Sequence, residues 1–73
     1  MKIHESVNNI GIYKIVKKLF LRNQQNVEIT SFYANDTLFK RDMEVRGNHI
    51  HKLYTQLYDD AGKITEHVIN FMA

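Results

Sequence analysis

The chain has 73 residues, 44% of them hydrophobic and 25% charged, and it contains no cysteine, which excludes disulfides and thiolate metal sites. Its longest purely apolar run is Leu19-Phe20-Leu21, far below the ~20 residues that cross a bilayer, and residues 1–9 lack the apolar segment of a secretory leader. We therefore expect a cytoplasmic protein that does not act at membranes. The net charge of +2 is unevenly spread, with +4 on residues 1–22 and −2 on residues 23–73.

A chain of this length is expected to form one small domain, residues 1–73, in which residues 1–8 are flexible. Such a domain buries only about 60% of the surface that its unfolded chain exposes, so its stability is marginal. Since disulfides are excluded, association with a second copy is the remaining way to enlarge the core. We therefore expect a homo-oligomer, in the first place a homodimer.

Residues 8–22 are predicted to form an amphipathic helix. Apolar side chains recur there at i, i+3, i+4, i+7 and i+8, which is one stripe of a helix, and Asn8 or Asn9 can cap its start. These apolar residues are Ile12, Ile15, Val16, Leu19 and Phe20. Four cations then share a second stripe, the predicted basic helix face: Lys14, Lys17, Lys18 and Arg22. Because β-branched residues are frequent in this segment, a long strand is the alternative.

The next segment alternates between apolar and polar residues and is predicted to be a β-hairpin. Its first strand places Val27, Ile29 and Tyr33 on one side, and a turn follows at residues 34–37. The chain then returns with Phe39, Met43 and Val45. Gly47-Asn48 is the next turn signal.

Two structures compete for the segment that begins at residue 49. A second helix at residues 49–60 fits the spacing of its apolar side chains. A hairpin fits better, because "YDDAGK" has an aspartate early and a glycine where a turn needs a left-handed residue, between flanks rich in aromatic and β-branched residues. Pairing Tyr58 with Lys63 then places Tyr54 opposite His67 and Leu53 opposite Val68.

This register separates the histidines. His49 and His51 fall on the face of Leu53 and Leu57, whereas His67 falls on the other face, so the three cannot converge on one zinc ion. We expect neither a metal nor another cofactor.

Both faces of this hairpin are half apolar, and one helix can cover only one face of a small sheet. We predict that the uncovered face is a surface for partner binding or self-association, since exposed apolar patches on small proteins usually mark protein contacts. That face consists of Ile50, Tyr54, Tyr58, Ile69 and Phe71.

The sequence offers little material for catalysis. It has two serines, no glycine-rich phosphate loop and no arguable pair of nucleophile and base, so we expect a protein that is not an enzyme. A metal-free small ribonuclease that uses His49, His51, Tyr54 and Arg46 is the third hypothesis, because acid–base work on RNA needs only a histidine and a cation near the phosphate.

The fold predicted from these patterns is α+β: the N-terminal helix lies on an antiparallel sheet of about four strands. The predicted function is that of a small non-enzymatic binding protein, a regulator or inhibitor that occupies another protein. An Asn- and Tyr-rich domain without catalytic signatures is typical of accessory proteins from phages and mobile elements. The alternative is a nucleic-acid-binding protein, because clustered cations on a helix can follow a phosphate backbone.

Overall fold

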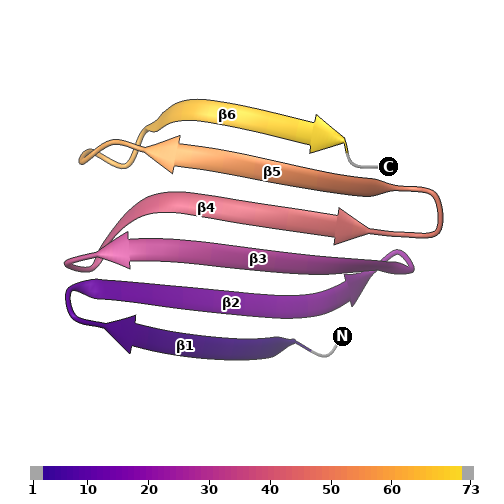
Figure 1. Ribbon diagram of the computed structural model, residues 1–73, viewed down its shortest axis with the longest axis horizontal. Coiled ribbons are helices and arrows are strands. Elements are labelled where there is room, and N and C mark those ends of the chain that lie inside the picture. Colours follow the sequence, from indigo (N-terminus) through magenta and orange to yellow (C-terminus); the bar gives the residue numbers. More distant parts are fainter. Residues whose placement is uncertain (1–2, 72–73) are drawn as a thin grey trace.

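The computed structural model describes residues 3–71, which form one antiparallel sheet of six strands (Figure 1). Each strand pairs with the next one in sequence, so the sheet is a meander. The strands are β1 (His4–Ile10), β2 (Tyr13–Arg22), β3 (Gln25–Ala34), β4 (Thr37–Arg46), β5 (His51–Tyr58) and β6 (Ile64–Phe71).

The described residues contain no helix, which overturns the predicted α+β fold. The N-terminal helix is replaced by β1 and β2, and the alternative helix at residues 49–60 is replaced by β5. Residues 4–8, expected to be flexible, lie in β1, where every residue is exposed. The antiparallel sheet itself was predicted, although with about four strands.

Two-residue turns explain why residues 13–22 form a strand. Such turns need a positive φ at one or both central residues, which glycine and asparagine tolerate. Gly11 has a φ of 60° in the turn before β2, and Asn23 and Gln24 have φ of 51° and 63° in the turn after it. Asn35 and Asp36 repeat this geometry between β3 and β4, with φ of 50° and 64°. Residues 13–22 are therefore held between two hairpin turns.

The apolar residues of β2 have the spacing of a helix because the strand is apolar on both faces. Successive residues of a strand point to opposite faces, so Ile15-Val16 and Leu19-Phe20 each give one apolar side chain to either face. The four cations of the predicted basic helix face separate in the same way. Lys14, Lys18 and Arg22 fall on one face of the sheet, and Lys17 falls on the other.

Directly opposed residues share a face, so the register sorts the side chains into two sets. We call the first set the Val27 face. At its centre lie Val27 and Ile29 of β3 and Met43 and Val45 of β4, flanked by Val16 and Phe20 of β2 and by Tyr54 of β5. We call the second set the Glu44 face. At its centre lie Glu28, Thr30, Asp42 and Glu44, flanked by Leu19 of β2 and Leu53 of β5.

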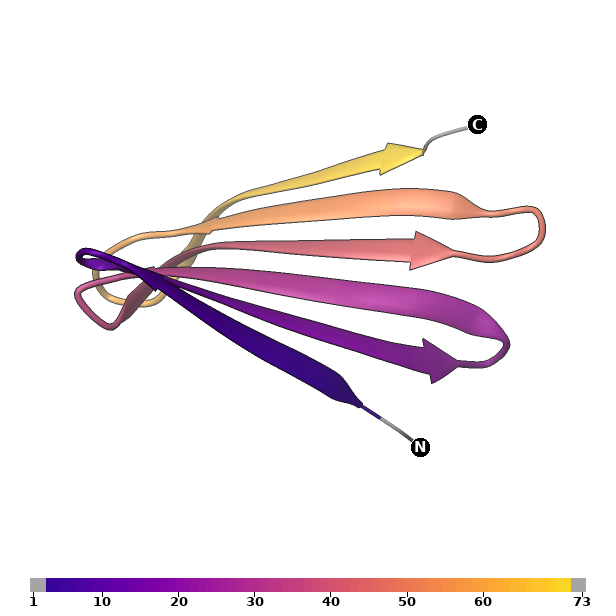
Figure 2. The ribbon, with the colours of Figure 1, turned by 60° about the horizontal axis from the view of Figure 1, so that its bottom comes forward.

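Within residues 3–71 the sheet has no second layer, as the turned view of the twisted ribbon shows (Figure 2). Val27, 6% exposed, is the one buried hydrophobic residue of the described chain. Leu53 and Leu57 lie on the hairpin face that the predicted helix would have covered, and they are only half-buried. The chain exposes 5631 Å² at a mass of 8.7 kDa. A compact monomer of this mass would expose about 4,700 Å².

The predicted hairpin around residues 34–37 is confirmed. Val27 lies opposite Val45, and Ile29 lies opposite Met43. The expected position of Phe39 is wrong, because a β-bulge shifts the register beside Phe32 and Tyr33. The Phe39 ring is 6.3 Å from the Phe32 ring, on the Glu44 face.

The hairpin of β5 and β6 is also confirmed, and its turn is the predicted one. Gly62 has a φ of 83°, and the Asp59 carboxylate accepts hydrogen bonds from the backbone N–H groups of Ala61 and Lys63, both at 2.9 Å. The exact register was wrong, since a bulge beside Leu57 and Tyr58 places Tyr54 opposite Ile69 rather than His67. From Leu53 to Leu57 the shift is two residues, which keeps the predicted faces there, whereas Tyr58 pairs with Ile64, one residue from the predicted Lys63.

Candidate functional site

The Val27 face combines an apolar centre with more cations than carboxylates. Its centre contains the aliphatic side chains of Val27, Ile29 and Val45. The cations of this face are Lys14, Lys18, Arg22, Arg41 and Lys52. Within residues 3–71, the one carboxylate that the register places on the same face is Glu5, whose oxygen is 3.9 Å from the Lys18 ammonium. Asp36, in the turn between β3 and β4, is also 3.9 Å from the Lys14 ammonium. Cations therefore still outnumber carboxylates on this face.

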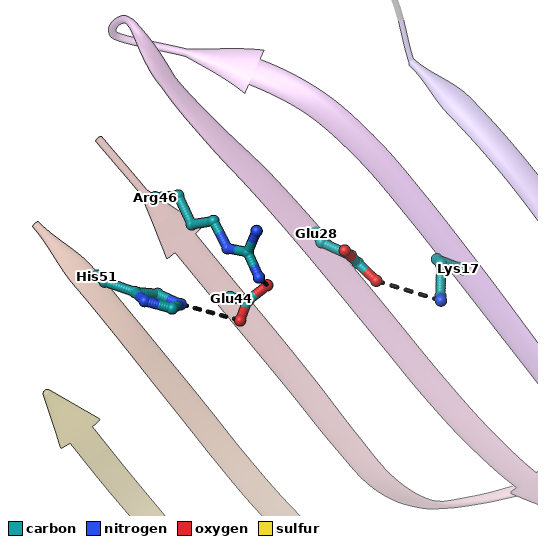
Figure 3. A network of polar contacts seen from close by, with 5 residues as sticks. All are labelled: Lys17, Glu28, Glu44, Arg46 and His51. Atoms are coloured by element: carbon teal, nitrogen blue, oxygen red, sulfur yellow. Dashed lines mark hydrogen bonds and ion pairs between the residues drawn. The ribbon is translucent and has the colours of Figure 1, made fainter. Parts of the chain in front are cut away.

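The Glu44 face carries charges that compensate one another (Figure 3). Glu28 and Glu44 are directly opposed, which is unfavourable for like charges. Each carboxylate has its own cation: Lys17 is 3.2 Å from Glu28, and Arg46 is 2.9 Å from Glu44. The hydrogen bond from His51, at 3.0 Å, is the main reason why the pKa of Glu44 lies below its ordinary value, with Arg46 adding to it against the effect of burial.

The residues predicted to form a partner surface are partly brought together. Tyr54, Tyr58 and Ile69 belong to the Val27 face. Ile50 precedes β5 in the loop that begins at Gly47, and a Cβ on Gly47 would meet the Ile50 side chain at 3.0 Å. The side chain of Phe71 lies outside the described part of the structure.

The side chains proposed for a ribonuclease do not converge. His51 and Arg46 meet at Glu44 on the Glu44 face. Tyr54 is on the opposite face, where its ring lies 6.3 Å from the ring of His67, and His49 is exposed in the loop before β5. Residues 3–71 contain no group of three His, Cys, Asp or Glu side chains able to hold a metal ion.

The sequence analysis missed a polar cluster that the pairing of β4 with β5 builds on the Val27 face. Arg41 lies opposite Gln56 and donates to the Gln56 Oε1 from Nε at 3.1 Å and from Nη2 at 2.7 Å. The Tyr58 hydroxyl donates to the same oxygen at 2.9 Å, and its ring lies 5.9 Å from the Arg41 guanidinium. No local motif marks this cluster, because its members meet only through strand pairing.

Beside this cluster the Val27 face has a hollow of about 380 Å³. Its lining residues are Ile29, Arg41, Met43, Tyr54, Gln56 and His67. A second hollow of about 290 Å³ lies toward the β2–β3 turn and shares Ile29 and Met43 with the first.

Comparison with known proteins gives no further guide to this site: no family model matches the chain, and no significant match is found among curated proteins or solved structures. The described residues also contain no helix that is long and apolar enough to span a membrane.

Proposed function

We propose that the protein is a non-enzymatic binding protein that regulates or inhibits another protein by occupying it through the Val27 face. The observation that carries this proposal is the arrangement of an apolar centre inside a cationic border. Protein interfaces have an apolar core and a polar rim, and complementary rim charges select the partner. The surface that fits this face is apolar with an acidic border.

Two features favour a protein over a nucleic acid. Single-stranded nucleic acids stack their bases on open aromatic rings. Two tyrosine rings carry a cation instead, since the Lys14 ammonium lies 4.8 Å from the Tyr33 ring centre and the Arg41 guanidinium lies over Tyr58. The centre of the face is also aliphatic rather than aromatic, since Val27 and Ile29 oppose Val45 and Met43.

The test is charge reversal on each face. Immobilised protein should first retain a partner from nuclease-treated lysate. With the purified partner, the double variant Lys18→Glu/Arg22→Glu should lower the association rate about tenfold, because charges at the rim of an interface steer the encounter. Lys40→Glu on the Glu44 face is the matched control and should leave the rate unchanged. Retention that disappears after nuclease treatment, or equal effects of both variants, would contradict the proposal.

We further propose that the second copy of the homodimer covers the Glu44 face along β1 and β2. Exposed large apolar side chains gather there: Ile10, Tyr13, Leu19, Leu21 and, beside Tyr13, Phe39. The Lys17–Glu28 ion pair keeps this patch close to neutral, so two copies can meet without repulsion. The chain exposes about 900 Å² more surface than a compact monomer of its mass would expose. This excess is close to the ~800 Å² that each partner buries in a standard protein interface.

A further inference from the structure

The hollow on the Val27 face has one apolar wall and one polar wall. Ile29 and Met43 come from neighbouring strands and supply apolar surface, and the rings of Tyr54 and His67 extend it. Arg41 and Gln56 supply the polar wall. A volume of about 380 Å³ lies within the range of small-ligand sites, about 300–1,000 Å³.

The guanidinium of Arg41 is oriented before any ligand arrives. Gln56 Oε1 accepts two of its five N–H donors, and the guanidinium carbon lies over the Tyr58 ring, 5.9 Å from the ring centre. The donors fix the orientation of the Gln56 amide, because the oxygen must face Arg41 and Tyr58. The Gln56 NH₂ group therefore has no hydrogen-bond partner in the described part of the chain. Arg41 likewise has no acidic partner there.

We propose that this hollow binds an apolar carboxylate. The carboxylate accepts hydrogen bonds from the remaining donors of Arg41 and from the Gln56 amide, while its apolar body lies on Ile29, Met43 and Tyr54. A planar guanidinium matches the two oxygens of a carboxylate, and charge-assisted bonds of this kind are roughly twice as strong as neutral ones. This proposal rests on the proposed function for the source of the ligand. The carboxylate then belongs to an acidic or C-terminal residue of the partner protein.

The first experiment uses 4-phenylbutyrate as the probe and follows amide chemical shifts of the full chain by NMR. We expect saturable shifts at the lining residues and a Kd at least tenfold lower than that of 4-phenylbutanamide, which has the same shape without the charge. Acetate, which has the charge without the apolar body, should be weaker than either. Equal affinities for the acid and the amide would overturn the inference, and this comparison needs no variant.

The second experiment removes the guanidinium. Arg41→Gln should raise the Kd for 4-phenylbutyrate about tenfold and abolish the preference over the amide. Arg41→Lys should keep part of that preference, because it keeps the charge but loses the planar fork. Arg46→Gln on the Glu44 face is the matched control and should bind as the wild type does. An Arg41→Gln protein that melts like the wild type and still prefers the acid would overturn the inference.

Peptides distinguish a small-molecule ligand from the partner's carboxylate. A peptide that ends in a free phenylalanine carboxylate is compared with its C-terminal amide and with a blocked peptide that contains glutamate next to phenylalanine. Binding of either acidic peptide, in competition with 4-phenylbutyrate, supports a partner-derived ligand, whereas binding of the small acid alone indicates a free metabolite-like acid. If Lys18→Glu/Arg22→Glu weakens partner binding while 4-phenylbutyrate neither binds nor competes, the inference fails and the proposed function stands.

Discussion

The two faces of the sheet are built from alternate residues of the same strands, yet they differ at their centres. The Val27 face has an aliphatic centre bordered by more cations than carboxylates, whereas the Glu44 face has acidic groups at its centre and a cation beside each of the opposed glutamates. The second arrangement gives each of the opposed glutamates a cation within the sheet. The first arrangement leaves both apolar surface and positive charge for another molecule to match.

The largest expected effect separates the dimer surface from the partner surface. Leu21→Asp places a charge in the proposed dimer contact and should raise the dimer dissociation constant more than a hundredfold, about 3 kcal/mol, because the buried carboxylate has no partner. Ile69→Asp places the same charge on the Val27 face and should leave the dimer intact. Sedimentation at micromolar concentration is the measurement. Dissociation caused by Ile69→Asp would exchange the roles of the two faces.

The second prediction compares one substitution on both faces. Val27→Ala should lower the free energy of unfolding by about 2 kcal/mol, because it removes two buried methyl groups and leaves a cavity. Val68→Ala on the Glu44 face should cost less than about 0.5 kcal/mol, since Val68 is 38% exposed. Urea unfolding of both variants at one protein concentration tests the difference. Equal losses would show that the Glu44 face has a comparable core in solution.

The third prediction concerns Asp42, at the centre of the Glu44 face. Its Oδ1 atom is buried without a hydrogen-bond partner in the described residues, and its Oδ2 atom is 3.9 Å from the Lys40 ammonium. Its opposed neighbours are Thr30 and Thr55. Asp42→Thr should therefore raise the free energy of unfolding by about 1 kcal/mol, because threonine favours strands and removes the unpaired oxygen. A loss of stability would mean that the Lys40 ion pair outweighs both gains.

The smallest expected effect is a pH dependence on the Glu44 face. The pKa of Glu44 is lower in the folded protein than in the unfolded chain, so the folded state binds fewer protons and this group stabilises the fold above the ordinary glutamate pKa of 4.5. That contribution, about 0.5 kcal/mol, is lost as the pH falls through the lowered value. Glu44→Gln should flatten the decline in stability below pH 4.5 when unfolding is followed across that range. If the variant loses stability at low pH as steeply as the wild type does, the loss comes from other carboxylates.

The sequence predicted the turns and hairpins after residue 26, because their signals are local. Asn35-Asp36 and the run from Asp59 to Gly62 adopt turn geometries that few other residues tolerate. Alternation then placed Tyr54 and Tyr58 on one face and Leu53 on the other, and a register error of two residues left the faces of Leu53 and Tyr54 unchanged.

The first third of the chain was predicted wrongly because β2 is apolar on both faces. Its apolar residues come in pairs four positions apart, which fits one stripe of a helix as well as two faces of a strand. The turn residues Gly11 and Asn23 decide between these structures, since their positive φ values allow tight hairpins on both sides of the strand.

After residue 26 the sequence by itself therefore determined where the chain turns and which side chains alternate, since both depend on neighbouring residues. The tertiary structure decided how the strands combine those side chains into surfaces. Arg41 and Gln56 are 15 positions apart and meet only because β4 pairs with β5 in one register. Lys17 lies beside Glu28, on the face opposite to the other cations of β2, because successive side chains of a strand point to opposite faces. Long-range pairing thus created the cationic Val27 face and its hollow, which no local pattern records.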